Sequence, residues 1–429
     1  MLDISSNKGH NSEDGSSAGK MKAPTVFLFL SIILPIFSLL NRLIITQQTR
    51  FNPISSMSST ALLSFTNSEI DSVADSLQRV AGLDSPSIDW DALRELIKDE
   101  AHKSHKDWDQ TESAASRLAS ILKGPDDLIF RRMFSRVLED GNWEDAAVAA
   151  SKFNSKPWIV LVTGVNGIRK TTSVYQDWLK QALYESLGDT FTGSIDELPD
   201  GRNSFFRQLD YMIATLANIE FQALYEVTQL EAYSARKAEI FTRYRTLSEM
   251  LGILLVREAQ GKGMNIMVET SGRDIAMFKY IDYLFPDSEA CSHRKMVVHF
   301  TINDIAYAER SVDARMAREM SNGQTILQSR SQFTTEEEYA RAVIQTNQGG
   351  PYGSSVLRGV QADSQAVWAI VRHPFDSDSS IPSPGQSWLK AHIEVVAGEG
   401  EWSARAVVSD DKTGTATYGA SHVFTPPTR

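Results

Sequence analysis

The residues best suited to chemistry in this sequence form one short run between two regular segments. An apolar stretch at 158–162, short enough for a buried strand, precedes the run, and apolar residues with helical spacing follow it. Backbone N–H groups in such a loop converge on one space, and the first turn of the helix adds unpaired donors. The run therefore predicts a site for di- or triphosphates, with contacts from Gly164, Asn166, Gly167, Arg169, Lys170, Thr171 and Thr172.

Two residues of this run have expected roles, and a third departs from the usual pattern. Lys170 would reach the β- and γ-phosphates, and Thr171 would offer its hydroxyl to Mg²⁺. The usual phosphate loop has glycine before the lysine, where this chain has Arg169. If that position needs a positive φ, arginine costs roughly 1–2 kcal/mol there. Its guanidinium could crowd the phosphate or pair with it. The alternatives are an ordinary strand–turn–helix and a loop that binds nucleotide weakly.

Composition limits the class of protein. The chain has 429 residues, of which 42% are hydrophobic and 23% charged, which is ordinary for a globular protein of two or three domains. Its formal net charge of −11 argues against a general nucleic-acid-binding protein. Cys291 is the only cysteine, so an internal disulfide and a cysteine-based zinc site are both excluded, and a reducing compartment fits best.

The first 67 residues predict a leader or targeting segment without a stable fold. Residues 23–40 are uncharged and mostly apolar, long enough to span a bilayer, although two prolines and the absence of a flanking basic cluster weaken that interpretation. Residues 41–68 lack acidic residues, as organelle transit regions do. The segment indicates a plastid-type organelle or a membrane anchor. The alternative is translation from Met57, which would leave the protein cytoplasmic.

The remaining sequence predicts an α/β fold in three parts. Residues 68–152 predict a helical layer, 153–333 a nucleotide-binding domain, and 334–429 a linker with a small β-rich unit. Buried strands are expected at 158–162, 264–268 and 296–302, separated by helical segments, which favours a parallel sheet with helices on both faces. A long helical insert is expected to contain Phe205, Phe206 and Leu209. Gly164, Glu269 and Asp304 follow three strands and should face one crevice.

The loop, the Glu269-Thr270-Ser271-Gly272-Arg273 stretch and a later arginine-rich helix resemble zeta-toxin-like small-molecule kinases of the P-loop NTPase superfamily. The resemblance implies ATP and Mg²⁺ as cofactors, with Thr171 and Glu269 at the metal. It implies that lid arginines clamp the transferred phosphoryl group, the candidates being Arg310, Arg315 and Arg318. It also implies an aspartate that takes the acceptor's proton, for which Asp189, Asp196 and Asp200 are candidates and Asp196 is favoured.

A second resemblance and a non-enzymatic alternative remain open. Gly164-Val165-Asn166-Gly167 and Gly188-Asp189-Thr190-Phe191 resemble motifs of signal-recognition-particle GTPases, which would make GTP the nucleotide. Against this, the stretch that ends in Asp304 has no lysine in the position of the guanine-reading motif. A degenerate loop in a scaffold without turnover is the third alternative. The expected partners are a nucleotide and a small-molecule or protein phosphate acceptor, and membrane contact would come only from residues 23–40.

Overall fold

The computed structural model describes residues 65–82, 88–152, 155–288, 293–372, 384–409 and 415–425. The predicted leader lies almost entirely outside these ranges, including residues 23–40 and Met57. Residues from Leu62 to Arg429 form one compact unit. Within the described ranges, the helices are all too short or too polar to cross a membrane.

The described chain begins with six helices. They are α2 (Asn67–Ala81), α3 (Trp90–Glu100), α4 (Trp108–Leu122), α5 (Leu128–Met133), α6 (Ser135–Asp140) and α7 (Trp143–Ala150). Side-chain caps define several of their starts. Thr66 and Glu69 form a capping box at α2, and Asp89, Asp107 and Asp127 accept backbone N–H bonds at the next three helices.

The central sheet is mostly parallel, as expected for an α/β fold. Its strands are β1 (Trp158–Thr163), β2 (Ser204–Arg207), β3 (Asn265–Glu269), β4 (Arg294–Ile302), β5 (Leu389–Ala397), β6 (Trp402–Ser409), β7 (Ala416–Tyr418) and β8 (His422–Phe424). The strand order is β2-β3-β1-β4-β5-β6-β7, and β8 pairs with β6. The pairs among β1 to β5 are parallel, whereas β6 runs antiparallel to β5. The carboxyl ends of β1, β3 and β4 therefore meet at one edge of the sheet.

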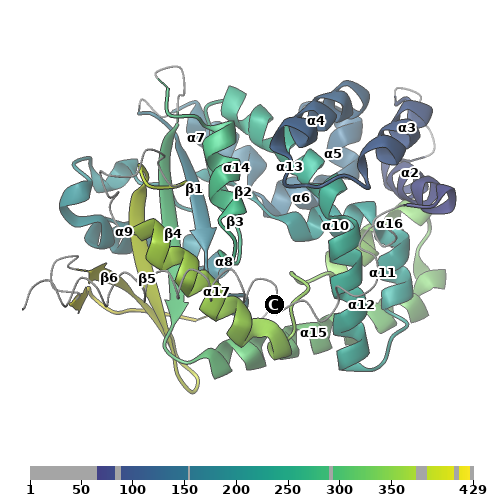
Figure 1. The fold of residues 1–429 in the computed structure, drawn as a ribbon. Helices are drawn as coiled ribbons and strands as arrows, with labels where there is room; N and C mark the ends of the chain where they lie inside the picture. Colours follow the sequence, from purple (N-terminus) through teal and green to yellow (C-terminus); the bar gives the residue numbers. More distant parts are fainter. Residues whose placement is uncertain are drawn as a thin grey trace, which may run out of the picture. The chain divides into compact units, whose positions relative to one another are not determined.

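Helices cover both faces of this sheet. Alternate residues of β1 point to opposite faces, and both sets are buried. Val160 and Val162 pack in one core with Leu183 of α9 (Leu179–Leu187), whereas Ile159 and Leu161 belong to the core that contains α13 (Arg245–Gly261). Figure 1 shows α17 (Ser354–Arg372) and α14 (Ala276–Leu284) lying across the strands. All six residues of β1 are buried, which explains the continuous apolar run in the sequence.

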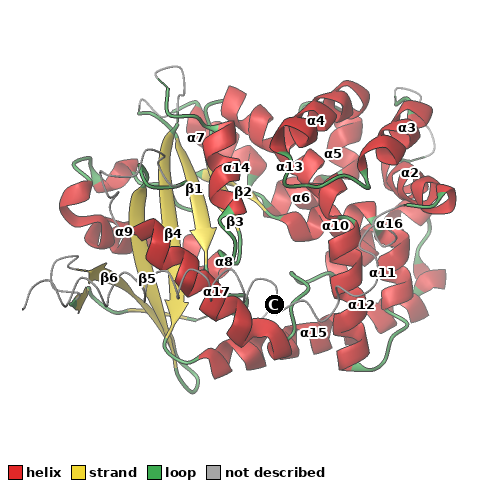
Figure 2. Cartoon of the chain, viewed as in Figure 1, coloured by secondary structure: helices red, strands yellow, loops and turns green. Residues whose placement is uncertain are grey.

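A second, wholly helical region lies beside the sheet (Figure 2). It combines α2 to α6 with helices from later in the chain: α10 (Leu209–Leu216), α11 (Asn218–Leu224), α12 (Leu230–Arg243), α13 and α16 (Glu336–Thr346). The long helix α15 (Ile305–Gln328) contacts both α17 and α12, and so connects the sheet with this helical region. The remaining elements are α8 (Lys170–Val174), η1 (Gly188–Thr190), η2 (Ile195–Glu197) and η3 (Arg330–Gln332).

The structure differs from the sequence-based expectation in two places. Phe205 and Phe206 do not begin a helix but lie in β2, which pairs with β3 at one side of the sheet. The C-terminal segment also differs from the predicted linker and small β-rich unit: α16 and α17 occupy its first part, and β5 extends the central sheet by pairing with β4. Most of the Ser- and Pro-rich stretch expected as a boundary lies outside the described residues. The predicted hairpin of β5 and β6 is present, but it belongs to the main sheet.

Candidate functional site

The loop between β1 and α8 has a backbone that its sequence explains in part. Gly164 has φ 132° and Gly167 has φ 87°, conformations that L side chains rarely adopt. A Cβ at Gly167 would also lie 2.7 Å from the carbonyl oxygen of Ala308 on α15. Glycine at this position therefore lets the loop pack directly on α15.

Lys170 occupies the centre of this loop. Its Nζ donates to the carbonyl oxygens of Gly164 at 2.6 Å and Val165 at 3.0 Å, and it lies 3.2 Å from Oε1 of Glu269. Thr171 Oγ1 donates to the other oxygen of Glu269 at 3.0 Å. Burial lowers the pKa of Lys170, while Glu269 opposes that shift. The predicted lysine, threonine and glutamate thus form one connected cluster at the ends of β1 and β3.

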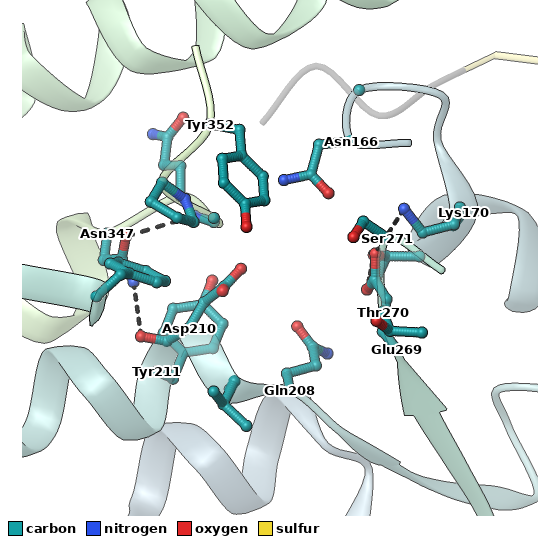
Figure 3. A pocket seen from close by; sticks show the side chains of 18 of the residues that line it. Asn166, Lys170, Gln208, Asp210, Tyr211, Glu269, Thr270, Ser271, Asn347 and Tyr352 are labelled. Atoms are coloured by element: carbon teal, nitrogen blue, oxygen red, sulfur yellow. Dashed lines mark hydrogen bonds and ion pairs between the residues drawn. The ribbon is translucent and has the colours of Figure 1, made fainter. Parts of the chain in front are cut away.

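This cluster forms one wall of a cavity of about 830 Å³. Figure 3 shows Lys170 and Glu269 on one side of the space and Asp210 on the other, with Tyr352 above Asp210 and Gln208 at the bottom of the view. The helical region supplies the far wall, which includes Trp108, Arg136 and Phe241. Such a volume is large for a pocket and suits two ligands side by side.

The cavity is strongly cationic although the chain as a whole is acidic. Three carboxylates line it, from Asp210, Glu269 and Asp274. Asp140 and Glu249, outside the lining, pair with Arg136 and Arg245. The positive charge that remains in excess predicts an anionic ligand, because a cleft lined by one sign of charge concentrates the opposite sign. Eight cationic side chains line the cavity: Lys106, Arg136, Arg169, Lys170, Arg245, Arg273, Arg315 and Arg318.

Asp210 faces the loop from the other side of the cavity. It lies in the first turn of α10, just after β2, and β2 is paired in parallel with β3 so that Arg207 is opposite Val268. The carboxyl ends of these two strands therefore bring Asp210 close to Glu269. Burial, with a smaller contribution from the Glu269 carboxylate, raises the pKa of Asp210 to about 6, while Lys237 and Arg315 oppose the shift.

A buried polar network holds the wall behind Asp210. Lys237 Nζ donates to both oxygens of Glu319 at 2.8 Å and to Oδ1 of Asn347 at 2.9 Å. Asn347 Nδ2 in turn donates to the main-chain oxygen of Asp210 at 3.0 Å. Lys237 and Glu319 are both fully buried, so each needs the other as a counter-ion. This network links α12 and α15 to the turn that carries Asp210.

Two of the three expected lid arginines lie at the cavity. Arg315 and Arg318 of α15 line it, and Arg315 Nη2 donates to the carbonyl oxygen of Gly350 at 3.2 Å. Arg310 is exposed, lies outside the cavity lining and stacks its guanidinium over the ring of Tyr307 at 4.4 Å. The helical period of α15 explains the difference, because positions 315 and 318 share a face that position 310 does not.

The expected phosphate-binding residues also gather here, apart from one glycine. Asn166, Gly167, Arg169, Thr171 and Thr172 all line the cavity together with Lys170 and Glu269. Gly164 is not among the lining residues and contributes its carbonyl oxygen to Lys170 instead.

The three candidate aspartates from the sequence, of which Asp196 was favoured, lie elsewhere. Asp196 is an exposed residue of η2, and Asp189 is exposed in η1. Asp200 is buried and accepts from the backbone N–H groups of Arg202 and Asn203, so it stabilises a turn. None of the three lines the cavity. Asp304, also expected there, caps the start of α15 by accepting from the N–H of Ala306 at 2.9 Å.

Asp210 was missed because the strand before it was interpreted as a helix. β2 has four residues, all buried, and Phe205 and Phe206 fit a helical stripe with later residues as well as they fit a short strand. The available signal was an aspartate directly after a short apolar run, as in Ser204-Phe205-Phe206-Arg207-Gln208-Leu209-Asp210. The residues from the helical region, such as Arg136, carry no local signal because separate helices bring them together.

Comparison with known proteins adds no relationship, since no protein-family model, curated protein or solved structure matches the chain. Among the described residues, no group of three or more His, Cys, Asp or Glu side chains could hold a metal ion. The Thr171 hydroxyl and the Glu269 carboxylate are nevertheless adjacent oxygen groups, 3.0 Å apart. Two such ligands suffice where phosphates and water complete the coordination of Mg²⁺.

Proposed function

We propose that the protein is a P-loop phosphotransferase that uses ATP and Mg²⁺ to phosphorylate a small anionic acceptor. One observation carries the proposal. Lys170, Thr171 and Glu269 lie on one wall of the cavity, and Asp210 lies on the opposite wall with a pKa raised to about 6. Such an arrangement suits phosphoryl transfer, which depends mainly on positioning the reactants and neutralising their charge.

The loop wall would bind the phosphate chain. Asn166, Gly167 and residues 169–172 line the cavity near the start of α8, where their backbone N–H groups would bind phosphate oxygens. Lys170 would exchange its bonds to the Gly164 and Val165 carbonyls for phosphate oxygens. A magnesium ion held by Thr171 and Glu269 would neutralise charge on those oxygens. Arg315 and Arg318 enter from α15 and would stabilise charge on the transferred group.

Asp210 would act as the general base. The acceptor hydroxyl would attack the γ-phosphorus, the bond to the β,γ-bridging oxygen would break with ADP as the leaving group, and the hydroxyl proton would pass to the Asp210 carboxylate. A pKa of about 6 leaves this group mostly ionised at neutral pH and still able to accept a proton. Asn347 fixes the main chain of Asp210 and so limits the positions of its carboxylate.

The helical wall indicates the acceptor. Trp108, Tyr211 and Phe241 offer aromatic surface, and the Arg136 guanidinium lies 4.8 Å from the centroid of the Tyr211 ring. Lys106, Arg136 and Arg245 add cationic groups on the same side, each in an ion pair, with Asp274, Asp140 and Glu249 respectively. The combination favours a small molecule with a phosphate or carboxylate group over a neutral metabolite.

The switch-GTPase alternative has less support. Asp304 stands where that family reads guanine, but its carboxylate is used as a helix cap and does not line the cavity. The helical wall with Asp210 also has no use in a protein that only hydrolyses its bound nucleotide. The assay of ADP formation described next distinguishes a kinase from a scaffold without turnover.

The experiment is an assay of ADP formation by the full-length chain with Mg-ATP and a panel of acceptors. Sugar phosphates, nucleoside monophosphates and hydroxy acids would be tested beside their neutral counterparts. We expect an anionic acceptor to stimulate ADP formation, Lys170→Ala to abolish the stimulation, and Lys279→Ala, an exposed lysine of α14 outside the cavity, to preserve it. Equal and unstimulated ADP formation by the wild type and Lys170→Ala would refute the kinase and favour the scaffold.

A further inference from the structure

Arg169 has an unusual backbone at the position where a phosphate loop normally has glycine. Its φ is 67° and its ψ 25°, in the left-handed region. Among the described residues, only Lys123 and Asn142 besides Arg169 are non-glycine residues with positive φ. The conformation costs roughly 1–2 kcal/mol for an L residue, and such strain persists at sites where the surroundings hold it in place.

Trp402 of β6 holds the Arg169 side chain. The guanidinium carbon of Arg169 lies 5.4 Å from the centroid of the Trp402 ring, which is within range of a cation–π contact. Tyr307 packs against the same tryptophan in an edge-to-face arrangement with ring centroids 6.3 Å apart. Nε of Arg169 is buried and has no hydrogen-bond partner. The side chain is thus positioned by packing, and in the part of the chain that the structure describes its guanidinium makes no ion pair.

Arg169 lines the cavity together with two other arginines. Arg315 and Arg318 line the same space, and within the described ranges none of the three has a carboxylate as an ion-pair partner. Burial lowers the pKa of Arg169, and the positive charges of Arg318 and Arg315 lower it further. Three unpaired guanidinium groups beside Lys170 repel one another, and a bound polyanion would remove that repulsion.

We propose that Arg169 is a phosphate-binding residue built into the loop, where its guanidinium contacts the terminal phosphates of the bound nucleotide and Trp402 acts as its positioning residue. The identity of the ligand as a nucleotide rests on the proposed function, whereas the polyphosphate site itself does not. A guanidinium suits this task because its planar donors match two phosphate oxygens at once. Arginine in place of glycine strains the backbone at this position but adds a positive charge to the loop.

The test compares the wild type with Arg169→Gly, using Mg-ATPγS and inorganic tripolyphosphate as probes in calorimetric titrations. Glycine relieves the positive φ, so the unliganded variant should melt about 1–3 °C higher. We expect its affinity for both probes to fall by about tenfold or more, since a charge-assisted contact is lost. Arg358→Gln, on the exposed side of α17 and outside the cavity, should change neither affinity.

A more stable Arg169→Gly variant that binds both probes as tightly as the wild type would overturn the inference and leave the proposed function standing. Loss of tripolyphosphate binding in Arg169→Gly, in a protein that does not select ATP, would support the inference and refute the nucleotide. Failure of the wild type to bind either probe would refute both. The combined gain in stability and loss of affinity is a result that a merely structural role would not give.

Trp402 has its own test. Trp402→Leu should weaken tripolyphosphate binding about threefold, and Trp402→Phe should restore most of it, because phenylalanine retains an aromatic face. In an Arg169→Gly background Trp402→Leu should have no further effect on affinity. The same threefold loss in both backgrounds would show that Trp402 acts on the fold and not through Arg169.

Discussion

The two walls of the cavity are built in different ways. The loop wall comes from the ends of adjacent parallel strands, where Lys170 and Thr171 follow β1 and Glu269 ends β3. The helical wall collects residues from α4, α6, α10 and α12, which are far apart in the sequence. The loop wall therefore has a recognisable sequence motif, whereas the helical wall has none.

Under the proposed function, the two walls would have different roles. The loop wall carries the features that any phosphate site needs: backbone donors, a lysine and an oxygen ligand for a metal. The helical wall carries what would make the protein specific, namely Asp210 and an aromatic, cationic surface around Arg136. Changes on the loop wall should therefore alter nucleotide binding, and changes on the helical wall should alter turnover.

The largest effect is expected from Asp210→Asn. The amide cannot accept the acceptor's proton, so acceptor-stimulated ADP formation should fall by about 10²–10⁴-fold. Steady-state kinetics with saturating Mg-ATP measure the change. Asp196→Asn is the matched control, because Asp196 is an exposed residue outside the cavity. A loss of less than about threefold in Asp210→Asn would remove Asp210 from the mechanism.

The pH dependence of turnover should follow the same group. Because the pKa of Asp210 is raised to about 6 and the base acts when ionised, the rate should fall about tenfold for each pH unit below 6 and level off above it. Rate profiles between pH 4.5 and about 8 would show this limb. The residual activity of Asp210→Asn should not show this fall in rate at low pH. If the fall survives the substitution, it reports the titration of another group.

Thr171→Val tests the loop wall on its own. The variant keeps the shape of the side chain but removes the hydroxyl that contacts Glu269, so the Mg²⁺ concentration for half-maximal activity should rise by about tenfold. Magnesium titrations at fixed ATP measure it. Thr325→Val, which removes an exposed hydroxyl from α15, serves as the control. An unchanged magnesium requirement would show that Thr171 is not a metal ligand.

The smallest effect is on stability, and it has the opposite sign to the effect on turnover. The folded-state pKa of Asp210 lies above its usual value of 3.8, so the folded protein holds this proton more tightly than the unfolded chain does. Stability contributed by the protonated carboxyl is lost as the pH rises from about 4 to 6, and the deficit remains above pH 6. Asp210→Asn should therefore stabilise the protein by about 1–2 kcal/mol at pH 8 and by little at pH 4.

That stability difference is measured by denaturant unfolding of the wild type and the variant at both pH values. A variant that is less stable than the wild type at pH 8 would mean that ionised Asp210 is well accommodated in the fold. The two walls would then be less distinct than proposed.

The sequence predicted most of the loop wall and little of the helical wall. The apolar run before Gly164 and the strand ending at Glu269 are local patterns, and parallel pairing brings them to one edge of the sheet. Arg315 and Arg318 were named, with Arg310, only through the resemblance to small-molecule kinases, and the structure brings these two to the cavity. Asp210 was missed because β2 is too short to distinguish strand from helix by periodicity.

The C-terminal strands were interpreted as a separate unit for a related reason. Their alternating pattern predicts a hairpin, but the pattern does not contain the partner of β5, which is β4. Pairing over such a sequence distance depends on the complete fold. The contact between Arg169 and Trp402 depends on this same pairing, so it also could not be predicted from local patterns.

The division between the walls is tested most directly by calorimetric titration of Mg-ATPγS into the wild type, Lys170→Ala and Asp210→Asn. The account predicts that Lys170→Ala weakens binding at least about tenfold, whereas Asp210→Asn binds within about twofold of the wild type. Unchanged affinity in Lys170→Ala, or an equal loss in both variants, would contradict the assignment of nucleotide to the loop wall.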